Sequence, residues 1–154
     1  MNKRIRILVL TLAGMTLAST AIAQSPKHAL EGVWSFTVVP DPVGLPPYSN
    51  LRSFSRDGVA MTVDGSNGAF GTASTAVGVW ERTGSREFSF VMYAVLTKNG
   101  IVTGRQKLQG VVTLDPYGHT LSGIGKTTVY DLAGNEQFNG TAKISGERLP
   151  LLDD

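Results

Sequence analysis

Apolar and polar residues alternate along most of the chain after residue 31. In segment 87–96, Phe88, Phe90 and Met92 lie at every second position, and segment 101–114 alternates in the same way, with Arg105 and Lys107 among the intervening residues. A repeat of two residues is typical of a β-strand with one buried face. No segment has the apolar spacing of an amphipathic helix, so the sequence predicts an all-β protein.

Turn residues divide this pattern into strands. Asp-Gly and Asn-Gly pairs, such as Asp57-Gly58 and Asn99-Gly100, favour tight turns with positive φ. They delimit eight predicted strands, at 32–39, 50–54, 59–63, 74–82, 87–96, 101–114, 120–131 and 136–148. Short connections make consecutive strands antiparallel, and we predict an eight-stranded antiparallel up-and-down barrel, with a β-sandwich as the alternative. The proline-rich segment 39–47 is expected to be a long loop, because proline cannot donate to a central ladder.

One short phrase occurs twice, as Gly32-Val33-Trp34 and as Gly78-Val79-Trp80. Glycine allows the backbone to coil tightly at a barrel end, and a tryptophan two residues later can close that end with a large apolar side chain. Both phrases therefore favour a small closed barrel.

The predicted interior leaves two alternatives open. Bulky residues packed against the many inward glycines would form a dry core, whereas the missing side chains would otherwise leave a cavity of ligand size. Such a cavity would take a small, largely apolar ligand. Its apolar walls would be Trp34, Phe36, Trp80, Phe90, Met92, Leu108 and Phe138, and its polar groups would be Gln106 and Thr127. This assignment of faces places no ionisable group securely inside.

The N-terminal residues have the pattern of a secretory signal peptide. Lys3, Arg4 and Arg6 precede an apolar run, and Ala21-Ile22-Ala23 provides a cleavage site. The predicted organisation is a signal peptide over 1–23, a polar leader over 24–30, a β-barrel domain over 31–149 and a C-terminal tail over 150–154. We expect a periplasmic or extracellular protein. The polar outer face of segment 101–114 argues against a barrel embedded in a membrane.

Composition excludes several classes of function. The signal peptide carries three of the 14 Lys and Arg residues and none of the 12 acidic residues, so the remaining chain has no basic excess to bind nucleic acid. The absence of cysteine excludes a lipid-modified N-terminal cysteine, a thiolate nucleophile and a cysteine-ligated metal. Only His28 and His119 are present, and no motif of hydrolysis or phosphate binding occurs, so we predict no catalytic residue, metal or cofactor.

Three phrases carry a resemblance to a known family. Residues 30–34, 54–58 and 78–84, in a chain of this size with a Gly-x-Trp at its first strand, resemble the calycin superfamily, and in particular small exported bacterial lipocalin-like proteins of unassigned role. The resemblance implies a cup that binds small hydrophobic molecules. The chain differs from typical lipocalins because it lacks their disulfide cysteines and a C-terminal helix.

Three classes of function follow as hypotheses. The first is a barrel that binds a small hydrophobic ligand in its interior. The second is a cyclase or isomerase of the barrel type, which would require an inward ionisable group. The third is an envelope protein that binds another protein through its outer surface or the loop at 40–47. The sequence leaves the oligomeric state open.

Overall fold

The computed structural model describes residues 29–41, 46–63, 67–68 and 70–150. The predicted signal peptide and nearly all of the predicted leader lie outside these residues. The strands are, in chain order, β1 (Gly32–Asp41), β2 (Tyr48–Phe54), β3 (Val59–Val63), β4 (Asn67–Gly68), β5 (Gly71–Ala73), β6 (Ala76–Arg82), β7 (Glu87–Lys98), β8 (Ile101–Leu114), β9 (Thr120–Asp131) and β10 (Glu136–Arg148).

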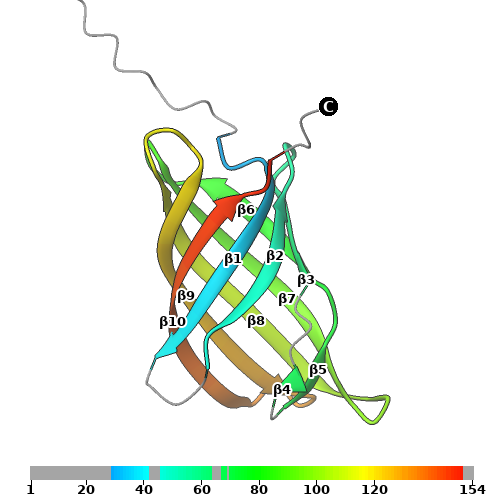
Figure 1. Ribbon diagram of the computed structural model, residues 1–154. Helices are drawn as coiled ribbons and strands as arrows, with labels where there is room; N and C mark the ends of the chain where they lie inside the picture. Colours follow the sequence, from blue (N-terminus) through cyan, green and yellow to red (C-terminus); the bar gives the residue numbers. More distant parts are fainter. Residues whose placement is uncertain (1–28, 42–45, 64–66, 69, 151–154) are drawn as a thin grey trace, which may run out of the picture.

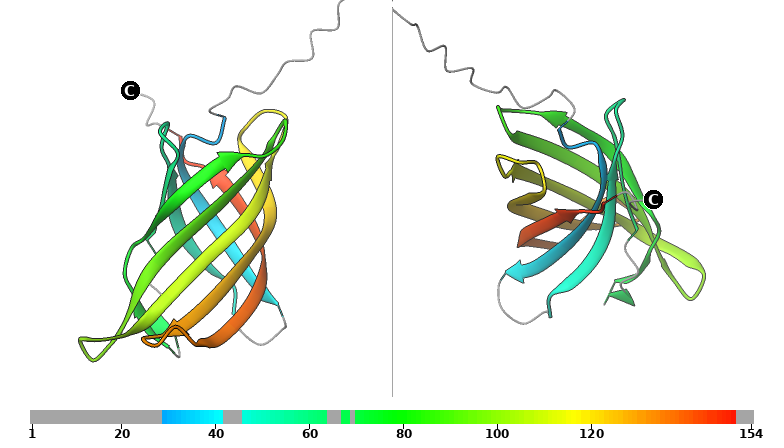
Figure 2. Two further views of the ribbon diagram at one scale, coloured as in Figure 1. Left: turned by 180° about the vertical axis from the view of Figure 1, so that it is seen from behind. Right: turned by 45° about the horizontal axis from the view of Figure 1, so that its top comes forward.

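Eight of these strands form a closed antiparallel barrel (Figure 1). The ring runs β1, β2, β3, β6, β7, β8, β9 and β10, and the pairing of β10 with β1 closes it, with Trp34 opposite Arg148. The two further views show strands on all sides of one barrel axis (Figure 2). The prediction of an eight-stranded up-and-down barrel is confirmed, and no helix occurs among the described residues.

Several predicted strand ends shift by two residues: β2 begins at Tyr48, β6 begins at Ala76, and β7 continues to Lys98. Two further differences have a physical reason. β1 continues past Val39 to Asp41, because Pro40 pairs only with Ala142 of β10 and lies beyond the end of the β2 ladder, where a missing N–H breaks no pairing with β2. A short hairpin of β4 and β5 was not predicted. It adds to β7 beyond β6, with Thr72 opposite Thr97, and so lengthens the wall at one end of the barrel.

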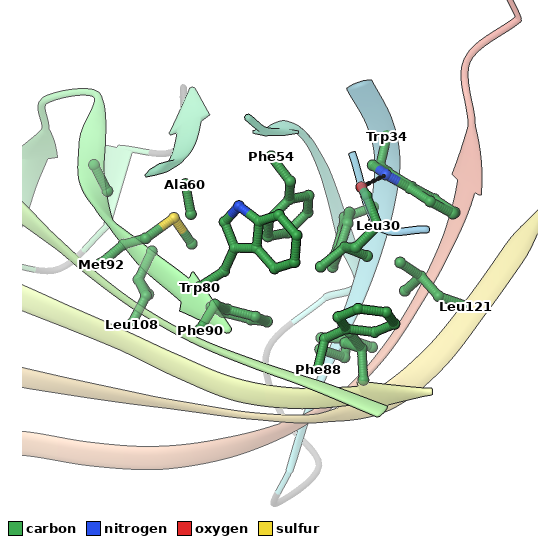
Figure 3. Close-up of a cluster of buried hydrophobic side chains, with 14 of the residues drawn as sticks. Leu30, Trp34, Phe54, Ala60, Trp80, Phe88, Phe90, Met92, Leu108 and Leu121 are labelled. Atoms are coloured by element: carbon green, nitrogen blue, oxygen red, sulfur yellow. Dashed lines mark hydrogen bonds between the residues drawn. The ribbon is translucent and has the colours of Figure 1, made fainter. Parts of the chain in front are cut away.

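Alternate side chains of the ring fill the interior with one hydrophobic cluster (Figure 3). Phe54 lies at its centre, with ring centroids 6.2 Å from Phe36, 6.1 Å from Trp80 and 6.1 Å from Phe90. These tilted and edge-on contacts add to the free energy gained from burying the rings. The core is thus continuous across the barrel axis.

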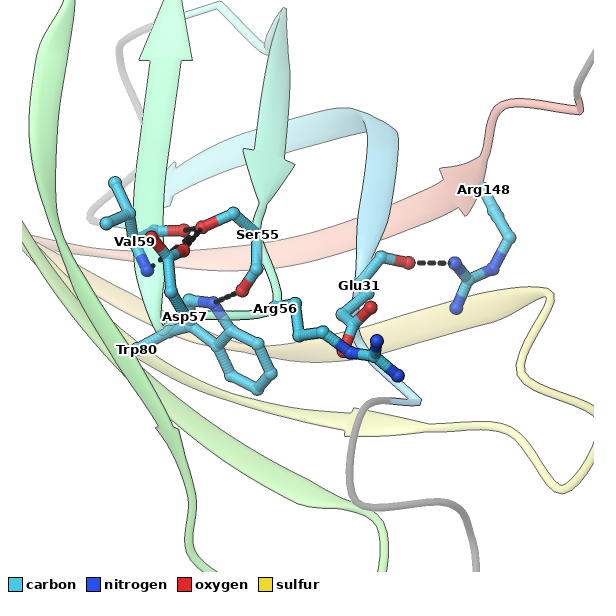
Figure 4. Close-up of polar contacts among 7 residues, drawn as sticks. All are labelled: Glu31, Ser55, Arg56, Asp57, Val59, Trp80 and Arg148. Atoms are coloured by element: carbon cyan, nitrogen blue, oxygen red, sulfur yellow. Dashed lines mark hydrogen bonds and ion pairs between the residues drawn. The ribbon is translucent and has the colours of Figure 1, made fainter.

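Trp34 closes the barrel end at which β1 begins. Its Nε1 donates to the carbonyl of Leu30 at 2.9 Å, and the guanidinium of Arg148 lies 4.4 Å from its ring centroid. Arg148 donates in turn to the carbonyl of Glu31 (Figure 4) and to the carbonyls of Ala29 and Gly118. The segment before β1 is therefore fixed to the last residue of β10, and burial lowers the pKa of Arg148.

Trp80 is held at the same end by a different set of contacts. Its Nε1 donates to the carbonyl of Ser55 at 2.9 Å (Figure 4), and its backbone N–H donates to the carbonyl of Gly58 at 2.8 Å. The β2–β3 turn is thereby attached to β6. The sequence predicts that a Gly-x-Trp phrase closes a barrel end, and the structure places both tryptophans at the same end.

Candidate functional site

A small cavity of the described residues lies in the interior of the barrel. Its volume is ≈ 20 Å³. Side chains or backbone of β1, β2 and β7 to β10 line it: Val38, Tyr48, Arg52, Phe90, Leu108, Gln109, Gly125, Lys126, Thr127, Ala142 and Ile144. A cavity of this size has room for a water molecule but not for a larger ligand without movement of side chains.

Packing of rings against glycines explains why the cavity is small. A Cβ at Gly110 would lie 2.7 Å from the ring of Phe90, and a Cβ at Gly140 would lie 2.7 Å from the ring of Phe138. These rings occupy the space that the missing side chains leave. Of the two alternatives for the interior, interdigitated packing therefore accounts for most of the volume.

Arg52 is buried in the barrel beside this cavity. It is 4% exposed, and its guanidinium lies 4.3 Å from the ring centroid of Phe36 and 5.0 Å from that of Phe90. Its Nε donates to Oδ1 of Asn50 at 3.2 Å. A guanidinium is weakly hydrated and stacks on aromatic faces, so two rings make its burial favourable.

The expectation that no ionisable group lies inside is therefore wrong. Phe54 supplied the signal that the sequence reasoning missed, because it is an apolar residue two positions from Arg52 on the same face of β2. The interior thus contains an ionisable group, a guanidinium, whereas the cyclase or isomerase hypothesis uses a buried carboxylate or tyrosine.

Two buried amide atoms lack a hydrogen-bond partner among the described residues. They are Nδ2 of Asn50, which is 7% exposed, and Oε1 of Gln106. Asn50 lies on β2 between Tyr48 and Arg52, and Gln106 precedes Leu108 on the same face of β8, so each is next to residues that line the cavity. A buried donor or acceptor without a partner costs about 1–3 kcal/mol, which a bound polar group would recover.

The nine predicted ligand-binding residues fall into four sets in the structure. Phe90, Leu108 and Thr127 line the cavity. Trp34, Phe36, Trp80 and Met92 are buried in the hydrophobic cluster instead, and Gln106 is half-buried next to the cavity. Phe138 lies half-buried toward the opposite end, with its ring centroid 5.6 Å from that of Phe70, which follows β4.

The predicted ligand-binding residues do not include those that β2 and β10 contribute to the cavity: Tyr48, Arg52, Ala142 and Ile144. Alternation along 136–148 did place Ala142 and Ile144 inside, but it could not show that they lie in the same wall of the barrel as β1 and β2. That arrangement depends on the closure of β10 onto β1.

Two larger hollows lie on the outer surface. One, of ≈ 410 Å³, is lined mainly by serine and threonine residues of β1, β9 and β10, and the other, of ≈ 340 Å³, lies over β6 and β7. Neither contains a buried polar group without a partner. We therefore take the interior cavity as the candidate site.

Other kinds of site find no support in the described residues. No group of three or more His, Asp and Glu side chains that could hold a metal ion occurs there. His119 is exposed in the β8–β9 turn, where its backbone N–H donates to Asp115. Within the same residues, no helix is long and apolar enough to cross a membrane.

The fold and the cavity define a small closed antiparallel β-barrel with a polar group of residues in its interior. Comparison of the chain with protein-family models and with curated proteins finds no match.

Proposed function

We propose that the barrel binds a small, largely apolar ligand that carries one polar group. The observation that supports this proposal is the buried amide of Asn50, whose Nδ2 has no partner in the described part of the chain and lies next to residues of the cavity. The polar group of the ligand would accept from Asn50 and contact Arg52. Its apolar part would contact Phe90, Leu108 and Ile144.

The small volume of the cavity makes the expected affinity modest. A ligand larger than a water molecule needs side chains to move, so it selects a minor conformation of the barrel. Its apparent affinity falls in proportion to the population of that conformation. Compact probes that combine a short alkyl chain with one polar group are therefore suitable, such as 1-octanol and octanoate.

The test follows the side-chain amide of Asn50 by NMR during titration with each probe. We expect a saturable shift of this signal with at least one of the two. Ala142→Trp should abolish the shift because Ala142 lines the cavity, whereas Thr141→Trp should leave it unchanged because Thr141 is the exposed neighbour on β10. If neither probe moves the Asn50 signal, or if Ala142→Trp binds as the natural protein does, the proposal is wrong.

We propose further that the protein is exported and cleaved after Ala23. The support is the sequence pattern of a basic start, an apolar run and a small-residue cleavage site. N-terminal sequencing of the protein recovered from the periplasm or the medium should give Gln24 as the first residue. A protein that stays in the cytoplasm with its N-terminus intact would contradict this.

A further inference from the structure

The outer surface of the barrel has an apolar face over three adjacent strands. We call the following residues the β3–β6–β7 face: Met61, Val63, Val77, Val79, Tyr93 and Val95. Each is between 42 and 61% exposed. They are contiguous, because Met61 lies opposite Val77 and Val77 lies opposite Tyr93 in the ladders. Leu51 of β2 extends the face, since it lies opposite Val63.

The usual alternation is reversed on β3. Its larger apolar residues Met61 and Val63 point outward, whereas Ala60 and Thr62 are buried inside the barrel. A strand that only had to cover the core would place its larger apolar residues inward. The outward placement of these side chains therefore calls for a second apolar surface.

The outward surface of β8 to β10 is mixed, since it exposes Val111 and Ile124 but also carries several charges. The outward positions of β8 to β10 include the charged residues Arg105, Lys107, Lys126, Lys143 and Glu147. The β3–β6–β7 face has no charged residue. A contiguous apolar area of this kind often marks a site of interaction.

We propose that the β3–β6–β7 face is the interface of a homodimer, with a second copy of this chain as its occupant. The six residues expose on the order of 500 Å² of surface, and with Leu51 and the border this approaches the roughly 800 Å² per partner of a standard interface. Because the face has no charged residue, two copies of it can pack together without repulsion between like charges. Sheet faces pack in this way in β-sandwiches.

The charges at the border of the face fit a two-fold arrangement. Glu81 follows Val79 on β6 at one end of the face, and Arg105 lies opposite Val95 toward the other end. A two-fold axis in the plane of the face and perpendicular to the strands brings one end of the first copy onto the other end of the second. Glu81 of each copy then lies toward Arg105 of the other. The hollow of ≈ 340 Å³ beside Val79 and Val91 gives room for side chains of the second copy.

The experiment measures the mass of the protein in solution by analytical ultracentrifugation. We expect a dimer at micromolar concentration. Val77→Lys, at the centre of the face, should give a monomer, whereas Ile124→Lys should remain a dimer because Ile124 is a 66% exposed outward residue on β9, away from the face. An equimolar mixture of Val77→Lys and Val77→Glu should restore the dimer. Circular dichroism of each variant monitors the fold.

Cysteine variants give a second test that does not introduce a buried charge. The chain has no natural cysteine, so a single introduced cysteine can form a disulfide only between two copies. Val77→Cys or Val79→Cys should yield a covalent dimer on mild oxidation, and Ile124→Cys should stay monomeric on a denaturing gel. A monomeric natural protein would overturn the proposal, as would a Val77→Lys variant that stays dimeric. A monomer that instead binds phosphatidylcholine vesicles through this face would show that a lipid surface, not a second copy, is its occupant.

Discussion

Two features of the backbone at position 32 require glycine. Its φ is +123°, and a Cβ at this position would lie 2.9 Å from Nη1 of Arg148. The glycine therefore lets the chain enter β1 while Arg148 covers Trp34. This explains physically why the first Gly-x-Trp phrase begins with glycine.

We predict that Gly32→Ala destabilises the barrel by about 3 kcal/mol, because it adds backbone strain at a φ of +123° and displaces the half-buried guanidinium of Arg148. Urea unfolding measures the change. Gly100→Ala is the control, since Gly100 also has a positive φ, of 78°, but a Cβ there has nothing within 4 Å. The control should lose only about 1 kcal/mol, the strain alone. Equal losses would mean that the contact with Arg148 contributes nothing.

Asp115 makes the β8–β9 turn sensitive to pH. Its carboxylate accepts from the backbone N–H groups of Tyr117, His119 and Thr120, and the bond from Thr120 is the main cause that lowers its pKa below the ordinary value of 3.8. A carboxylate with a lowered folded pKa stabilises the fold above its unfolded pKa. This contribution is lost as pH falls through the folded pKa.

We therefore predict that Asp115→Asn lowers the free energy of unfolding at neutral pH, and that the difference from the natural protein shrinks as pH falls below 3.8. A neutral amide oxygen accepts these N–H groups more weakly than a carboxylate. Urea unfolding at several pH values measures the difference. A difference that does not change with pH would show that the ionised carboxylate is not what holds the turn.

Alternation along the sequence predicts which side chains point inward on long strands, but it misses Arg52. Trp34, Phe36 and Met92 were assigned inward and are buried, because each belongs to a long strand with one clearly apolar face. Arg52 was not found because its strand is short and has mixed faces. Its burial depends on two rings from other strands, Phe36 and Phe90.

At the scale of the strands, glycine sets how closely β6 and β7 approach. A Cβ at Gly78 would lie 1.9 Å from the carbonyl oxygen of Val91, so any side chain there must push the two strands apart. At Gly125 on β9 a Cβ would only make ordinary contacts, the nearest at 3.6 Å from Ile144. Two inward glycines with the same sequence pattern thus have different reasons to be present.

We predict that Gly78→Ala lowers the free energy of unfolding by at least about 3 kcal/mol, because backbone atoms must move. Gly125→Ala should lie between no change and a gain of about 1 kcal/mol, because it reduces the freedom of the unfolded chain and fits the space beside Ile144. Thermal or urea unfolding of the pair measures both. Similar losses in the two variants would show that the contact between β6 and β7 does not require glycine.

The predicted strands agree with the structure wherever a turn motif marks both ends. The strands after residue 86 are examples, since Asn99-Gly100 and Asp115-Pro116-Tyr117-Gly118 separate β7, β8 and β9 within two residues of the predicted bounds. The β4–β5 hairpin escaped prediction because its strands are two and three residues long. A strand of two or three residues is too short to show an alternation of apolar and polar residues. The hairpin forms because β5 pairs with β7, and the local sequence does not reveal this pairing.

At the scale of the whole molecule, closure brings the two ends of the barrel domain together. Trp34 of the first strand lies opposite Arg148 of the last, and the N–H of Leu149 donates to the carbonyl of Val33 at 2.9 Å. Residue 150 therefore lies near residue 29, and a short linker can join them. The cavity exists only in the closed ring, because β1, β2 and β10 together form one of its walls.

The barrel should therefore fold when the chain is cut in the β7–β8 turn, but not when it is cut within β8. The first permutant covers residues 29–150, joins its old ends by a short Gly-Ser linker and opens between Asn99 and Gly100. We predict that it folds cooperatively with its tryptophans buried, because Asn99 and Gly100 lie in an exposed turn. A permutant opened between Leu108 and Gln109 should lose cooperative unfolding, since it divides the strand that pairs with both β7 and β9. Tryptophan fluorescence during urea unfolding distinguishes them. If both permutants fold equally well, the barrel does not depend on an unbroken β8; if neither folds, the contacts around Trp34 and Arg148 do not suffice to hold the new junction.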